Sequence, residues 1–408
     1  MRNLGAKLAL LSRQRKLAAK SAPPKNVRPE IGDQFDQRLC EVLGAQIEST
    51  SKGDLLLVRE RYALSQQYGK VSLSGSLSMP VALLDPLYRG LKNFDMSQAL
   101  FFDTETTGLA GGSGTYAFLV GIGFFEQGEF VSELLLMRDH RDEPALLSYL
   151  SQRLQEKTSL VSFNGRSFDA PLLATRFGMH HLPDPFQNRT HLDLLHLSRR
   201  LWGFSSLPNC RLETLEIEVL GAPRHQDVPG WMIPDLFFGF LKDRNPGPLK
   251  GVLEHNRRDI LAMVALCTYF ADLLSGEVPP DCPHLTLGLA RLWACLGNHE
   301  LSDVLFLAAL KNRRLRRDAE EKGFLCWARE LKKRGEMGKA ALVWRRTLTK
   351  HPTNLEATVE LAKYLEHQER DFHSALLLVE GRLRKPSLSQ QRRRELEHRA
   401  QRLRRRLA

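Results

Sequence analysis

The stretch that most constrains the fold runs from Phe101 to Leu109 and reads FFDTETTGL. An apolar run that begins at Ala99 leads directly into Asp103 and Glu105, and Thr-Thr-Gly follows. The run predicts a buried strand, and the glycine predicts the turn after it. Side chains alternate along a strand, so both carboxylates are expected on one face, where a divalent cation would offset their repulsion and lost hydration. A strand end with solvated acidic residues is the alternative.

Further acidic residues follow at positions that suit the same site. Asp169 comes after a predicted strand at 159–163 and an Asn-Gly turn, and it opens a helix. A helix cap is its alternative role. His255 and Asp259 lie four residues apart, so they share one face of a predicted helix whose neighbouring positions are apolar. A hydrogen-bonded His–Asp pair in the core is the alternative there.

A two-metal phosphoryl-transfer site needs several carboxylates. The sequence supplies four, namely Asp103, Glu105, Asp169 and Asp259. In such a site carboxylate oxygens hold two Mg²⁺ or Mn²⁺ ions, roughly 3.5–4 Å apart. One ion lowers the pKa of a water molecule, and the other stabilises the leaving 3′ oxygen. His255 could accept the proton from that water.

The length of 408 residues predicts two or three domains. Three strands in an antiparallel meander, followed by alternating strands and helices, predict an α/β domain with a mixed sheet and flanking helices. The pattern then becomes purely helical. The expected segments are a basic flexible arm at 1–30, a poorly defined lead-in at 31–94, the α/β domain at 95–275, a helical region at 285–383 and a basic tail at 384–408.

The helical region carries an internal repeat. Trp327–Leu331 (WAREL) reappears 34 positions later as Leu361–Leu365 (LAKYL), and Ala341 likewise matches Ala375. A helix–turn–helix period of 34 residues is typical of tetratricopeptide repeats, which bind protein partners. So few units predict packing against the α/β domain, and an irregular helical bundle is the alternative.

The net charge indicates which class of partner to expect, and the cysteines indicate the cellular compartment. The net charge of +12 favours nucleic acid as a partner, although solvated basic ends account for part of the excess. None of the six cysteines forms a C-x-x-C pair, which predicts reduced thiols in a cytoplasmic protein. The sequence has no apolar run of membrane-spanning length, so no membrane partner is expected.

These motifs resemble those of a known superfamily. Asp103–Leu109 resembles motif I of the DEDD 3′–5′ exonucleases, the stretch from Asn164 to Asp169 resembles motif II, and the stretch from His255 to Asp259 resembles motif III. The longer pattern over 95–275 is similar to the YprB-type ribonuclease-H-like domain family. The further matching segments are Asp193–Leu195, Ser198–Trp202, Leu212–Glu216, Arg224, Asp227–Gly230, Ile233–Pro234 and Asn256.

The resemblance implies a ribonuclease-H-like fold with a central five-stranded sheet and metal-dependent hydrolysis of phosphodiester bonds. It implies that the four carboxylates are metal ligands and that several residues contact the terminal nucleotide. These residues are Thr106, Gly108, Leu109, Asn164 and Phe168. His255 stands four residues before Asp259, the spacing of the tyrosine-type enzymes, because the histidine-type enzymes usually use five; its role as general base therefore stays open. Asp193 and Asp227 are candidates for supporting positions behind the metal ligands, and Asp193 is equally a candidate helix cap.

The leading hypothesis is a Mg²⁺- or Mn²⁺-dependent 3′–5′ exonuclease that acts on a single-stranded end of DNA or RNA. One alternative is a structure-specific endonuclease or DNA-repair accessory on the same fold. The segment 221–250, rich in Gly and Pro, is a candidate for a wall that closes the cleft beyond the terminal nucleotide. Another alternative is an inactive scaffold that binds nucleic acid or docks proteins through the helical repeat.

Overall fold

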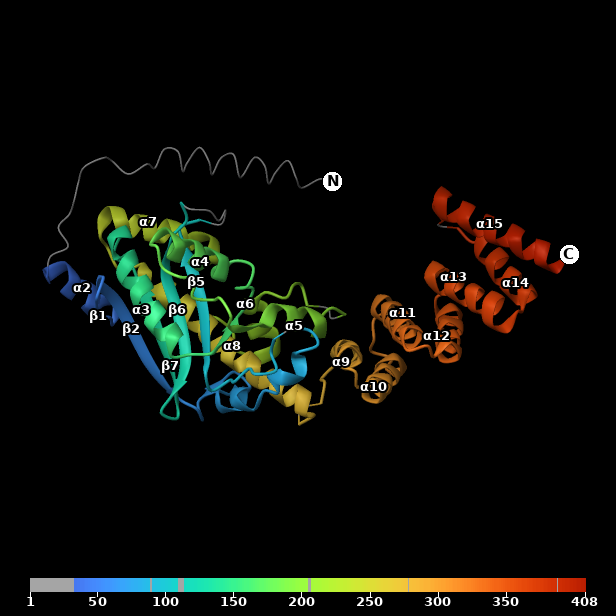
Figure 1. Cartoon of the computed structure of the whole chain (residues 1–408), viewed down its shortest axis with the longest axis horizontal. Coiled ribbons are helices and arrows are strands. Elements are labelled where there is room, and N and C mark those ends of the chain that lie inside the picture. The colour runs from blue at the N-terminus through green and yellow to red at the C-terminus, as the bar shows by residue number, and fades with distance from the viewer. Residues whose placement is uncertain (1–32, 89, 109–113, 205–206, 278, 387) are drawn as a thin grey trace.

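The computed structural model describes residues 33–408 except 89, 109–113, 205–206, 278 and 387. An α/β part continues into an arm of helices that extends away from the sheet (Figure 1). The predicted basic arm at 1–30 and Leu109 lie outside the described residues. Among the helices of the described part, none combines the length and the apolar character that crossing a bilayer requires.

The α/β part is built on a seven-stranded mixed sheet with the order β1-β2-β7-β6-β5-β8-β9. The strands are β1 Gln46–Thr50, β2 Gly53–Ala63, β5 Ala99–Thr106, β6 Ala117–Glu126, β7 Glu129–Leu136, β8 Ser159–Ser162 and β9 Thr190–Asp193. Five of them come from the segment 95–275, which confirms the predicted mixed sheet. The lead-in contributes β1 and β2 as two further strands, and a separate small hairpin, β3 Gln67–Tyr68 with β4 Val71–Ser72.

Strand β5 lies between an antiparallel and a parallel neighbour. It pairs antiparallel with β6 and parallel with β8, and β9 continues the parallel side. Phe101 and Phe102 are both buried but belong to two different cores, one on each face of the sheet. The apolar run therefore anchors β5 on both faces, and only its carboxyl end is polar.

Helices cover both faces of this sheet. They are α2 Asp33–Leu43, α3 Glu143–Gln155, α4 Asp169–Met179, α5 Leu194–Leu201, α6 Leu212–Leu215, α7 Ile233–Asp243 and α8 Leu249–Ser275. Single turns connect them: η1 Ser74–Ser78, η2 Val81–Leu84, η3 His140–Asp142, η4 Glu216–Leu220 and η5 Gly230–Met232. The long helix α8 packs across β5, β6 and β7, with Val252, Ile260 and Met263 fully buried. This helix carries the predicted motif from His255 to Asp259 to the carboxyl end of β5.

The helical arm consists of consecutive packed helices. They are α9 Pro283–Cys295, α10 His299–Lys311, α11 Arg317–Lys333, α12 Met337–Lys350, α13 Leu355–Tyr364 with its extension η6 Leu365–Glu369, α14 Phe372–Leu383 and α15 Gln390–Leu407. The repeated positions Ala328, Ala341, Ala362 and Ala375 are all buried in the arm's core. Helices α9 and α11 begin 34 residues apart, whereas α11 and α13 begin 38 apart. A tetratricopeptide repeat stays a prediction.

The first helix of the arm packs against the α/β part, and its last helix packs against the preceding arm helix. Helix α9 lies against α5, where Arg291 Nη2 donates to the carbonyl of Arg200 at 2.7 Å. At the other end, α15 buries Leu396, Ala400 and Leu403 against the arm. Several arginines of the predicted basic tail are thus held in a packed helix.

Candidate active site

The site begins at the carboxyl end of β5. Asp103 and Glu105 point to the same face, toward α8, because they are two residues apart in a strand. Asn256 lies fully buried on α8, and its Nδ2 donates to Asp103 Oδ2 at 2.8 Å. Gly121 stands opposite Asp103 in β6, where a Cβ atom would come within 1.9 Å of Asn256 Oδ1. The glycine therefore provides the space that lets α8 reach Asp103.

His255 is oriented by Asp227, which the sequence marked as a supporting residue. His255 Nδ1 lies 3.0 Å from both carboxylate oxygens of Asp227. A carboxylate only accepts, so Nδ1 is the donor in this contact, and in the neutral ring Nε2 then carries the lone pair. Nε2 lies 3.8 Å from Glu105 Oε1 and 3.6 Å from Asp259 Oδ2, so the free nitrogen faces the carboxylates.

Arg224 connects three acidic residues beneath the site. Its side chain is 2% exposed, and its guanidinium group donates to Glu216, Asp227 and Asp259. Burial alone would lower the pKa of Arg224, but Asp259 and Glu216 raise it above its ordinary value, so the charge is retained. The arginine engages Oδ1 of Asp259, and the other oxygen faces His255.

Asp169 joins the site as the first residue of α4, directly after the loop that follows β8. Its carboxylate accepts a hydrogen bond from the Thr104 hydroxyl. Asp193 stabilises the same loop, because its carboxylate accepts from the backbone N–H groups of Asn164 at 2.7 Å and Arg166 at 3.2 Å. It also accepts from Leu195 N at the start of α5. Asp193 thus caps α5, one of the two roles predicted for it, and fixes the loop that leads into Asp169.

The negative charges of the carboxylates in the cluster repel one another, and this repulsion affects their pKa values. Burial, followed by the charges of Asp259, Asp169 and a neighbouring carboxylate, raises the pKa of both Asp103 and Glu105 well above their ordinary values. Burial also raises the pKa of Asp169 to about 6, against the opposing effect of its hydrogen bond from Thr104. A positive charge in the middle would relieve this repulsion.

The donor set suits a hard divalent cation. All four acidic side chains offer carboxylate oxygens, and the side chains of Glu105 and Asp259 are 13% and 15% exposed, so solvent and ions reach them. Among the described residues, no group of three or more His, Cys, Asp or Glu side chains is arranged, as it stands, to hold a metal ion. A cation would therefore draw the carboxylates together, in competition with Arg224 for Asp259.

The described residues expected to contact a nucleotide lie close to members of the cluster along the chain. The Thr106 hydroxyl bonds the carbonyl of Gly108 at 3.0 Å, which shapes the turn after β5. Asn164 has a φ of 69°, a left-handed conformation that asparagine tolerates. Phe168 is 62% exposed beside Asp169, so its ring is free to stack on a base. Contact of these residues with a nucleotide stays a prediction.

Two residues that contact the cluster were not singled out from the sequence. Asn256 and Arg224 belong to the family pattern, but nothing in their local sequence indicates that they contact Asp103 and Asp259. The signal for Asn256 is its position next to His255 on the buried face of a predicted helix. Arg224 lies in a segment without regular periodicity, so only the fold brings it to the site.

Comparisons with known proteins agree with this architecture. Residues 100–271 match the family model of the RNase H superfamily. The chain is also 32% identical over 339 residues, 80% of each sequence, to a Bacillus subtilis (strain 168) protein described as uncharacterized protein YprB. Nucleases of the ribonuclease-H-like fold act on nucleic acid and generally use divalent metal ions, which suits the acidic cluster. The chain therefore belongs to the YprB family and carries an RNase H superfamily domain.

Proposed function

We propose that the protein is a Mg²⁺- or Mn²⁺-dependent nuclease that removes nucleotides from the 3′ end of a nucleic acid strand. The observation that carries the proposal is the group of four carboxylates, Asp103, Glu105, Asp169 and Asp259, gathered from β5, α4 and α8. Burial and mutual repulsion raise the pKa of Asp103, Glu105 and Asp169. Such a cluster is costly without a cation and becomes favourable with one.

The four carboxylates would hold two ions. Bound divalent ions supply Lewis acidity, which assists the attack of water on phosphorus and the departure of the 3′ oxygen. The chain's own residues then provide position and proton transfer. Asn256 and Thr104 orient Asp103 and Asp169 by hydrogen bonds.

His255 is the proposed general base. As water attacks, its oxygen forms a bond to phosphorus and the bond from phosphorus to the 3′ oxygen breaks. That oxygen takes a proton from solvent and becomes the 3′ hydroxyl of the shortened strand, and a 5′-mononucleotide leaves. Nε2 of His255 accepts the proton of the water, and Asp227 stabilises the resulting imidazolium at Nδ1. The Asp227–His255 contact supports this role although the motif spacing differs from that of the histidine-type enzymes.

Substitution of Asp103 tests the proposal. Purified wild type and Asp103→Asn are incubated with 5′-labelled single-stranded DNA and RNA in Mg²⁺, in Mn²⁺ and in EDTA. The amide side chain can still accept the hydrogen bond from Asn256, so the fold is preserved while a ligand charge is lost. We expect a metal-dependent ladder that shortens from the 3′ end in the wild type, and a rate at least about 100-fold lower in the variant.

Asp235→Asn is the matched control, because Asp235 is an exposed aspartate on α7 outside the cluster. Its cleavage rate should equal that of the wild type. Discrete internal products would identify the endonuclease alternative. Absence of cleavage with binding retained would support the inactive scaffold, and cleavage that persists in Asp103→Asn would refute the proposed site.

A further inference from the structure

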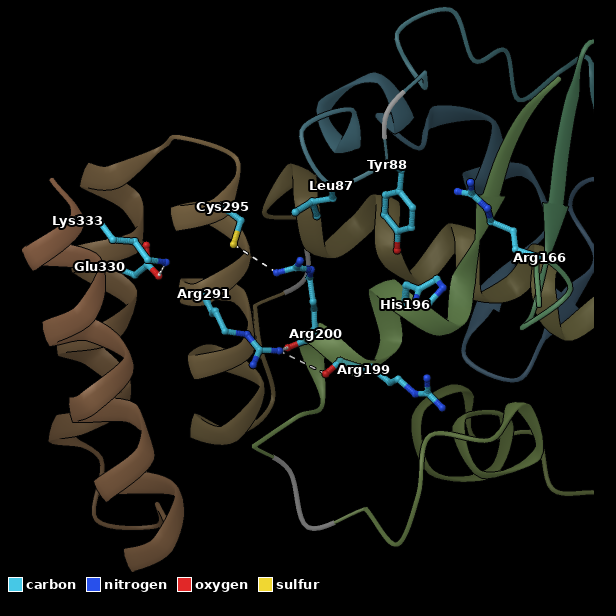
Figure 2. A pocket seen from close by; sticks show the side chains of 10 residues that line it. All are labelled: Leu87, Tyr88, Arg166, His196, Arg199, Arg200, Arg291, Cys295, Glu330 and Lys333. Atoms are coloured by element: carbon cyan, nitrogen blue, oxygen red, sulfur yellow. Dashed lines mark hydrogen bonds and ion pairs between the residues drawn. The ribbon is translucent and has the colours of Figure 1, made fainter. Parts of the chain in front are cut away.

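A cavity of about 650 Å³ lies where the helical arm meets the α/β part. Figure 2 shows its lining, with α5 on one side and the arm helices α9 and α11 on the other. Five basic side chains face it, whereas Glu330 is the one acidic residue among those that line it. The basic residues are Arg166, Arg199, Arg200, Arg291 and Lys333.

Most of this positive charge has no carboxylate partner. Within the described chain, the guanidinium groups of Arg166, Arg199 and Arg200 make no ion pair, although Arg200 Nη1 lies 3.3 Å from the sulfur of Cys295. Of the five basic side chains, Lys333 alone has an ion pair with a described residue, through a 2.7 Å contact with Glu330. Several unpaired guanidinium groups around one cavity repel each other, so an anionic ligand would stabilise the cavity.

The side chain of Arg291 is held in place at the cavity by two contacts. Its Nη2 donates to the backbone carbonyl of Arg200 at 2.7 Å, and its guanidinium carbon lies 5.3 Å from the ring centre of Phe204. This arginine therefore joins α9 to α5 and holds the carboxyl end of α5 at the cavity. Arg291 therefore keeps the basic side chains of the arm close to those of the α/β part.

The cavity is connected to the carboxylate cluster by a single loop. Arg166 lies three residues before Asp169, and Asp193 bonds the backbone N–H groups of both Asn164 and Arg166. The side chain of Arg166 also lines the cavity. The loop after β8 thus carries a cation toward the cavity, and the helix that it leads into begins with a proposed metal ligand of the cluster.

From this arrangement we propose that the cavity binds the phosphate backbone of the nucleic acid strand whose 3′ end lies at the carboxylate cluster. The identity of the ligand rests on the proposed nuclease function. Guanidinium groups bind phosphate through paired N–H donors and read no base, so the contact is independent of sequence. The helical arm is then part of the substrate groove.

Binding measured without cleavage tests this inference separately from the nuclease activity. The full chain is titrated in EDTA into 5′-fluorescein-labelled single strands of 3, 6 and 12 nucleotides, and fluorescence anisotropy is recorded over a series of salt concentrations. The test variant is Arg166→Gln/Arg199→Gln, since both side chains are exposed. The matched control is Arg313→Gln/Arg314→Gln, which removes two exposed charges from the turn after α10.

We expect wild-type affinity to rise with strand length and the test variant to lose most of that gain. Two lost phosphate contacts should weaken binding of the longest strand roughly tenfold and lower the slope of log K against log salt by about 1.4. The control variant should bind as the wild type does. Thermal melting by circular dichroism verifies that all variants are folded.

Each outcome has a distinct meaning. Equal binding by the test variant and the wild type would overturn the inference even if cleavage is observed. Absence of cleavage together with Arg166- and Arg199-dependent binding would refute the nuclease proposal and support the cavity as a backbone site. Inorganic phosphate and a 5′-mononucleotide serve as competitors. Displacement by either at low concentration, with no gain from strand length, would assign the cavity to a free phosphate-bearing ligand and overturn the inference.

Discussion

At the scale of single residues, the contact between β6 and α8 is the most sensitive point of the site. Gly121→Ala would place a methyl group 1.9 Å from Asn256 Oδ1, so Asn256 must move away from Asp103. We expect a loss of about 1–3 kcal/mol in the free energy of unfolding, as is usual for overpacking. Loss of the Asn256 hydrogen bond should also lower the cleavage rate about 10- to 100-fold.

Denaturant unfolding and cleavage assays measure both effects. Gly239→Ala on α7 is the control, since a Cβ there meets no atom within 4 Å. The double variant Gly121→Ala/Asn256→Ala should recover stability but not activity, because the clash is removed while Asp103 stays without its donor. Full activity in Gly121→Ala would contradict the role given to Asn256.

Residue patterns predicted which acidic residues share a face, and they missed the distant partners of those residues for a physical reason. Asp103 and Glu105 share a strand face and His255 and Asp259 share a helix face, so local periodicity was enough to pair them. Arg224 reaches Asp259 across 35 positions of the sequence, and no local rule encodes that contact.

At the scale of elements, the strand β9 carries a group whose ionisation affects stability. His191 bonds the Ser162 hydroxyl at 2.8 Å, and burial together with the charge of Arg166 lowers its pKa to about 3. An unfolded histidine titrates near 6.5, so the unfolded chain binds the proton more strongly. Stability from the neutral ring is therefore complete above pH 6.5 and declines as pH falls toward 3.

His191→Gln tests this, because the variant cannot titrate. The wild type should lose up to about 1.4 kcal/mol of unfolding free energy per pH unit below 6.5 that the variant does not lose. Denaturant unfolding of both proteins at several values between pH 7 and pH 5 gives the difference. A difference that stays constant over this range would show that His191 is not buried in its neutral form.

Most elements were predictable from periodicity, and the exceptions are short or depend on distant partners. The meander β5, β6 and β7 and the helix α8 have long, regular patterns and were predicted correctly. The strand β9 has four residues and no alternation, and it exists because it pairs with β8. The strands β1 and β2 join the sheet through β7, far along the chain, which the local sequence of the lead-in does not indicate.

At the scale of the whole molecule, one close backbone contact joins the arm to the α/β part. A Cβ at Gly288 of α9 would lie 1.9 Å from the carbonyl oxygen of Leu201 at the end of α5. Gly288→Ala should therefore force α9 away from α5 and destabilise the junction by about 1–3 kcal/mol. Differential scanning calorimetry should show the arm and the α/β part unfolding less cooperatively than in the wild type.

Gly381→Ala is the matched control, because this glycine also lies in an arm helix and a Cβ there meets no atom within 4 Å. It should leave the melting profile unchanged or slightly raise its midpoint, since alanine favours helix. Equal profiles for Gly288→Ala and the control would show that the junction does not couple the two parts.

The basic cavity and the carboxylate cluster are separate sites, and this separation affects how long a strand stays bound during successive cleavage steps. A strand bound only at the reacting end is released whenever that end is cut and moves. A strand whose backbone is also held at the arm stays associated while the shortened end advances by one nucleotide. Because guanidinium–phosphate contacts ignore base identity, the same contacts form again at each new register. The junction between the two parts would thus set how many successive nucleotides are removed in one encounter.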